Sequence, residues 1–121
     1  MLATDHDEHP VPPELHTIFH EIADAFAAGD YRLHNHAIDG VRPVAASTAE
    51  WIAASVSAYG DNLAPLHSST WNHAIYQWMG SYWQFLVDLT TEHQQVSDLT
   101  LHAKLHDGER PALEIQSVHV P

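Results

Sequence analysis

The fold of this chain is decided by residues 74–88, which read AIYQWMGSYWQFLVD. Gly80-Ser81 suits a two-residue turn of type II′ between two aromatic-rich runs, and such a turn sets the register of an antiparallel hairpin. The expected pairs on the inner face are Trp78 with Trp83, Tyr76 with Phe85, and Ala74 with Val87. We expect the helices to cover this face.

The alternate residues of the same hairpin point to the outer face of the sheet. The candidate partner- or ligand-binding residues on this face are Trp71, His73, Ile75, Tyr82, Leu86 and Asp88. Large aromatic side chains exposed together usually mark a contact surface. The alternative is that the loop of residues 30–46 or the N-terminal arm covers them.

His73 and Asp88 fall opposite each other in this register. A carboxylate so placed can orient an imidazole and raise its pKa, as a general base requires. The simpler interpretation is a cross-strand ion pair of small energy, because no nucleophile or oxyanion donor is evident beside it.

Two further strands are expected in the C-terminal part. Residues 99–106 alternate apolar and polar side chains, as in a half-buried strand. A three-residue loop with a bulge at Gly108 is expected to bring Leu99 and Leu101 opposite Leu113 and Ile115. The apolar side chains stand at odd positions up to Ile115 and at even positions at Val118 and Val120. This change of alternation predicts a β-bulge near Gln116 or Ser117.

Two amphipathic helices precede these strands. Pro12 and Pro13 open the first, whose apolar stripe ends before Gly29. The spacing of Ser47 and Glu50 is that of a capping box, which predicts the start of the second helix, and Gly60 ends it. Residues 30–46 are expected to form a structured loop with an extended piece around Val41.

The predicted fold is therefore α+β, with two N-terminal helices packed on one face of a four-stranded antiparallel meander sheet. Residues 1–11 carry several acidic and histidine side chains without periodicity, and we expect a flexible acidic arm there. Residues 12–121 form the single α+β domain.

Composition excludes several function classes. The chain has 121 residues and a formal net charge of −12, which disfavours nucleic acid and anionic membranes as partners. It has no cysteine and no long apolar run, so we expect a cytoplasmic protein that does not cross a membrane. His16 and His20 are spaced to share zinc, but H-E-x-x-H is absent. We therefore expect no metal and no cofactor.

The C-terminal half also resembles a known group. Residues 83–92 read WQFLVDLTTE, residues 97–99 read SDL, and the chain ends in VHVP. These segments resemble a group of small uncharacterised bacterial proteins with a W-x-x-L-V-D-L-x-T-x-E segment, an S-D-L segment and a V-x-V-P ending. By analogy, the resemblance implies a small immunity or accessory factor, and it assigns no functional residue.

Two functions compete. The first is an acidic protein-binding module, of the immunity or inhibitor type, whose outer sheet face binds a basic partner. The second is a small-molecule binder or hydrolase with a pocket near His73 and Asp88. A homodimer formed through the outer face is a third hypothesis. The missing catalytic motifs favour binding over catalysis.

Overall fold

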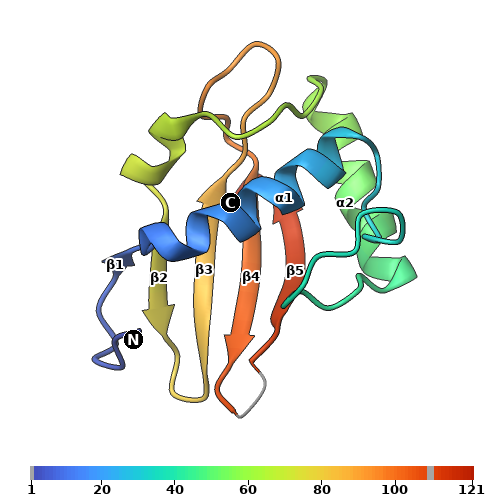
Figure 1. Cartoon of the computed structure of the whole chain (residues 1–121). Helices are drawn as coiled ribbons and strands as arrows, with labels where there is room; N and C mark the ends of the chain where they lie inside the picture. The colour runs from blue at the N-terminus through green and yellow to red at the C-terminus, as the bar shows by residue number, and fades with distance from the viewer. Residues whose placement is uncertain (1, 109–110) are drawn as a thin grey trace.

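The computed structural model describes residues 2–108 and 111–121 and shows an α+β fold in two layers (Figure 1). The elements are β1 (His9–Pro10), α1 (Pro13–Ala27), α2 (Ala46–Tyr59), the short 3-10 helix η1 (Ser68–Asn72), β2 (Ile75–Trp78), β3 (Tyr82–Asp88), β4 (Thr100–His106) and β5 (Leu113–His119). The strands form one antiparallel sheet in the order β1-β2-β3-β4-β5. The predicted fold class and meander order are confirmed, but the sheet has five strands instead of four.

The predicted register of the first hairpin is confirmed. Tyr76 pairs with Phe85 and Trp78 with Trp83 across β2 and β3. Gly80 has φ +97°, which suits the positive φ that primed hairpin turns require. Because the turn has two residues, its geometry leaves no freedom for the strands to slip.

The bulge predicted near Gln116 or Ser117 is also present. His102 pairs with Ser117 and Ala103 with Ile115, so Gln116 is the extra residue. The predicted partners of the leucines are wrong, however, since Leu101 faces Val118. The connection is longer than predicted, and residues 109–110 of the proposed three-residue loop lie outside the described residues.

One hydrophobic core fills the space between the inner face of the sheet and the helices. Figure 1 shows α1 crossing the sheet on this side. Its fully buried large side chains include Phe19 and Phe26 from α1, Ile52 from α2, and Phe85 and Leu101 from the sheet. Each helix buries its apolar stripe in this core, because a short isolated helix is only marginally stable in water and is stabilised by such packing.

The helix ends follow the sequence signals in three of four cases. After α1, Gly29 has φ +83° and donates to the carbonyl of Phe26, and Asp30 donates to that of Ala25, as at a helix end closed by glycine. Gly60 ends α2 with φ +80°. The predicted capping box is wrong, because α2 begins at Ala46 with no side-chain cap.

The loop between the two helices contacts the sheet at its β5 edge. Val41 forms an isolated parallel bridge with Leu113, and Arg42 donates its N–H to the Leu113 carbonyl at 2.9 Å. The extended piece expected around Val41 is thus present. It runs beside the start of β5, and its Arg42 side chain reaches Glu114 on the outer face at 3.2 Å.

The fifth strand comes from the N-terminal segment. His9 pairs with Tyr76, and the backbone N–H of Ala3 donates to the Tyr76 hydroxyl at 2.9 Å. The indole of Trp83 donates to the Ala3 carbonyl at 2.9 Å, and Val11 is buried in the core. The segment predicted as a flexible arm therefore lies along the edge and inner face of the sheet. The sequence signal missed this because the strand has two residues and includes a proline.

Candidate functional site

Four of the six predicted site residues lie together on the outer face of the sheet. Ile75 of β2 pairs with Leu86 of β3, and Tyr82 and Asp88 occupy the same face of β3. All four are partly exposed, and in the described part of the chain both helices pack against the opposite face. Together with His102 and His119 we call these residues the outer-face surface.

Trp71 and His73 do not lie on this surface, which corrects their predicted position. β2 begins at Ile75, and the chain before it turns through η1. The turn is held by Thr70, a fully buried residue whose hydroxyl donates to the Asp88 carbonyl at 2.5 Å. The pairing of β2 with β3 ends at Ile75 and Leu86, so Asp88 is not paired with His73, and the described residues show no ion pair between the two; on its other side Asp88 pairs with Thr100 of β4.

Trp71 instead packs against α1. Its ring stacks on His16 with centroids 3.7 Å apart and an interplanar angle of 2°, and it meets His20 and Phe19 edge-on. His16 and His20 thus enclose an indole ring, and they are not placed as a shared metal site. The sequence pattern missed this, because an aromatic residue beside a strand can pack on either layer.

Polar side chains hold the outer-face surface in place. Asp88 accepts a hydrogen bond from the Thr100 hydroxyl at 2.7 Å. The ammonium of Lys104 lies 4.4 Å from the centre of the Tyr82 ring, a cation–π contact. These contacts fix a carboxylate and an aromatic ring in an open position, as a binding surface requires.

Two histidines of this surface, His102 on β4 and His119 on β5, were not among the predicted site residues. His102 and His119 stack with ring centroids 4.3 Å apart, and Ser117 lies 3.0 Å from Nδ1 of His119. Nε2 of His102 is buried without a hydrogen-bond partner in the described residues. Burial lowers the pKa of His102, His119 lowers it further, and Asp88 opposes them. The alternation of residues 99–106 already predicts that His102 points to the outer face. That His119 lies beside it depends on the bulge in β5, which the alternation does not show.

A groove adjoins this surface at the edge of the sheet. It has a volume of about 420 Å³ and runs between α2 and β5. Its lining residues are Thr48, Trp51, Ser55, Gln116, Ser117, Val118 and His119. The Trp51 side chain is 75% exposed, and we call these residues the edge groove. His119 belongs to both areas, so the two form one continuous surface.

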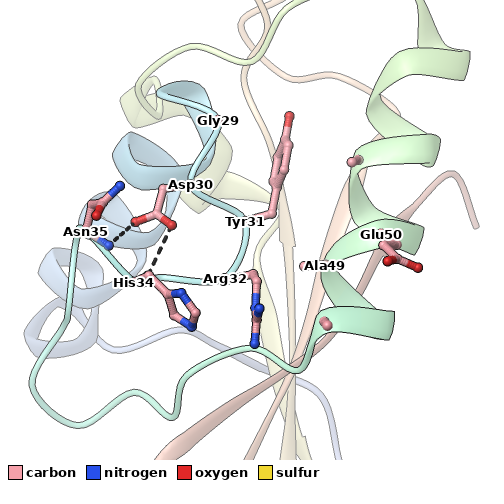
Figure 2. A pocket seen from close by; sticks show the side chains of 10 residues that line it. Gly29, Asp30, Tyr31, Arg32, His34, Asn35, Ala49 and Glu50 are labelled. Carbon is pink, nitrogen blue, oxygen red and sulfur yellow. Dashed lines mark hydrogen bonds between the residues drawn. The ribbon is translucent and has the colours of Figure 1, made fainter.

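A larger hollow of about 510 Å³ lies between α2 and the turn that follows α1 (Figure 2). Figure 2 shows Asp30 bonded to the backbone of His34 and Asn35. Burial raises the pKa of Asp30, but hydrogen bonds from the His36 ring and three backbone N–H groups outweigh it and lower the pKa to about 2. The carboxylate is fully used to shape the loop, so the hollow is secondary to the outer-face surface.

Comparisons with known proteins give one match. A family model described as a domain of unknown function, DUF7668, matches residues 23–121. No curated protein and no solved structure matches the chain. Within the described residues, neither helix is both long and apolar enough for a membrane span.

Proposed function

The chain belongs to this family of domains of unknown function, DUF7668, and we propose that it is a protein-binding module that contacts a basic partner through the outer-face surface and the edge groove. The observation that carries the proposal is an open sheet face, with Tyr82 and Leu86 on it, that continues into a groove beside the exposed Trp51. An immunity- or inhibitor-type role is one form of this function.

The shape of this surface supports a macromolecular partner. Its side chains lie on a sheet face, and the adjoining groove is open along β5. Aromatic residues dominate the energetics of protein interfaces, and Trp and Tyr are the residues most enriched at hot spots. Trp51 and Tyr82 are therefore the expected anchors.

The charge supports a basic partner. A net charge of −12 steers a positively charged protein and repels a second copy of the chain. Two of the four cations are held locally, since Arg42 pairs with Glu114 at 3.2 Å and Lys104 lies over Tyr82. The long-range field is thus negative, and the Asp88 carboxylate lies in the contact area itself.

The test uses a partner captured from the source cell and then purified. Tyr82→Ala and Trp51→Ala should each weaken its binding, whereas Thr17→Ala, on the exposed side of α1, should not. The association rate should fall as salt is raised. Equal affinity of all three variants would refute the surface, and a salt-independent rate would refute the steering. Sedimentation showing a dimer that Tyr82→Ala dissociates would replace the basic partner with a second copy.

A small-molecule site or hydrolase remains the alternative, and it now rests on different residues. His73 and Asp88 are not paired among the described residues, but Oγ of Ser117 and Nδ1 of His119 are 3.0 Å apart, as a nucleophile and its base would be. Hydrolysis of an activated ester that Ser117→Ala abolishes, with the fold retained, would support it; unchanged hydrolysis would eliminate it.

Two expectations about context accompany the proposal. The absence of cysteine suits a reducing compartment such as the cytoplasm. The bacterial origin implied by the C-terminal motifs is a prediction that the source genome tests.

A further inference from the structure

β5 lies at one edge of the sheet, and α2 runs beside it (Figure 1). At its first residue the edge already pairs with an extended segment of this chain. Leu113 donates its N–H to the Gly40 carbonyl at 2.7 Å and accepts the N–H of Arg42 at 2.9 Å. The backbone of β5 therefore accepts a further extended chain on the side that faces away from β4.

The loop that supplies this segment leaves the edge after Arg42. The next residue, Pro43, has no N–H with which to continue the pairing. Val44 donates its N–H to the Arg32 carbonyl at 3.1 Å instead. The loop thus pairs with the start of β5 and then turns back to its own backbone.

The rest of β5 keeps backbone groups that point outward. In an antiparallel ladder, successive residues turn their N–H and C=O groups to opposite sides. Since Leu113 faces the loop, Ile115 faces the same way, and the bulge at Gln116 shifts the alternation so that Val118 follows. Among the described residues, no backbone hydrogen bond reaches Ile115 or Val118 from this side. Such groups form a template for one more strand.

The edge groove continues along α2 past the end of β5. A second hollow, of about 280 Å³, is lined by Ser55, Ala58, Tyr59, Leu99 and Val120. It shares Ser55 with the edge groove, so one face of α2 flanks the strand from Thr48 to Tyr59. Trp51 and Val120 lie along this groove with 75% and 52% of their surface exposed. Extended peptides bind by adding a strand to such an edge, with side-chain pockets beside it.

Acidic side chains stand at both ends of this groove. Glu114 accepts a hydrogen bond from the side chain of Gln116, a lining residue, at 2.9 Å. It also binds Arg42 at 3.2 Å, so the segment that already pairs with this edge brings a cation to Glu114. At the other end, the exposed Asp98 donates its N–H to the Tyr59 hydroxyl at 3.2 Å. A segment with apolar and cationic side chains matches this arrangement.

We propose that a basic partner inserts an extended segment into this groove as a sixth strand, paired with β5 and flanked by α2. Its cationic side chains lie toward Asp98 and Glu114, and its apolar ones contact Trp51 and Val120. Residues 115–120 span roughly 20 Å, which accommodates about six residues. The inference rests on the proposed protein-binding function and names the part of the partner that the groove receives.

A second copy of the chain is a poorer occupant of this edge. Both copies would carry a net charge of −12 and repel each other. The bulge at Gln116 also twists the edge, and such bulges hinder the pairing of one sheet edge with another. A short, flexible segment can follow the twisted strand.

The test is calorimetric titration of the full chain with synthetic heptapeptides. In one set Lys or Arg alternates with Val, Ile, Leu, Phe or Tyr, and in the matched set Glu replaces each cation. A third form of the tightest peptide carries N-methyl groups on alternate amides, which removes strand hydrogen bonds and keeps the side chains. The protein variants are Trp51→Ala and Ser55→Tyr, which fills the groove. Met79→Ala is the matched control, because Met79 is 44% exposed in the turn between β2 and β3.

We expect saturable binding of a cationic peptide that Trp51→Ala and Ser55→Tyr each weaken about 5- to 30-fold, as at interface hot spots, and that Met79→Ala leaves unchanged. Hydrogen exchange of the Val118 amide should slow in the complex. The amide of Ser117, which already pairs with β4, should change less. The methylated peptide should not bind. Circular dichroism checks that each variant is folded.

Strand addition would be overturned if no cationic peptide bound, or if the acidic or methylated peptides bound equally well. A dimer in sedimentation that Ser55→Tyr dissociates would assign the edge to a second copy and overturn the proposal as well. The proposed function is judged separately, by the purified partner. If no peptide binds while Tyr82→Ala still weakens that partner, the binding function stands and strand addition falls.

Discussion

Replacement of Trp71 by alanine separates the observed fold from the position that the sequence predicted for this residue. On the outer face, Trp71 would contribute to partner binding and little to stability. In the structure it stacks on His16 at 3.7 Å and contacts Phe19 in the core, so its loss should loosen α1 from the sheet.

The expected cost follows from the burial of the ring. Truncation of a fully buried Trp costs about 3–5 kcal/mol. Trp71 is half-buried, which reduces this to roughly 2 kcal/mol, and the lost stacking on His16 adds about 0.5–1 kcal/mol. The total of about 2–3 kcal/mol corresponds to a drop in Tm of roughly 8–12 °C for a domain of this size.

The assay is urea unfolding followed by circular dichroism, because fluorescence would change with the number of tryptophans. Trp51→Ala is the matched control, since Trp51 is 75% exposed and its removal should cost less than about 0.5 kcal/mol. His16→Ala combined with Trp71→Ala should cost less than the sum of the two single changes. Equal losses from Trp71→Ala and Trp51→Ala would refute the packing described above.

Three further predictions concern pH and the N-terminal segment. The folded-state pKa of Asp30 is about 2, against 3.8 for the free group, so the stability that it contributes is present above about pH 4 and is lost as pH falls towards 2; Asp30→Asn should flatten the urea midpoint over that range. Burial and His119 lower the pKa of His102 in the folded state, so protonation of this ring favours unfolding. The free energy of unfolding should therefore fall as the pH drops below 6.5, and an NMR titration should place the pKa of His102 below 6.5. Trp83→Phe removes the hydrogen bond to Ala3 and should cost about 1 kcal/mol and speed proteolysis within residues 2–11, whereas unchanged cleavage would support a flexible arm.

The outer-face surface shows how far pattern analysis reaches into a site. Ile75, Tyr82, Leu86 and Asp88 were placed correctly, because side chains alternate along a strand and the turn set the register. Trp71 and His73 were misplaced, because the alternation was extended past the point where the strand begins. The stacking of His102 on His119 could not be predicted, because it depends on the pairing of two strands and on the position of the bulge between them.

The sequence by itself determined the fold class, the first hairpin's register, the bulge near Gln116 and the glycine ends of both helices. Each of these depends on periodicity or backbone conformation within a few neighbouring residues. The tertiary structure alone decided three other features: the docking of the N-terminal segment on β2, the turn at Thr70 that sends Trp71 to α1, and the meeting of Asp61 with His93. These contacts join residues that lie far apart along the chain or in different layers, so they depend on how the layers pack, and no local pattern encodes that packing.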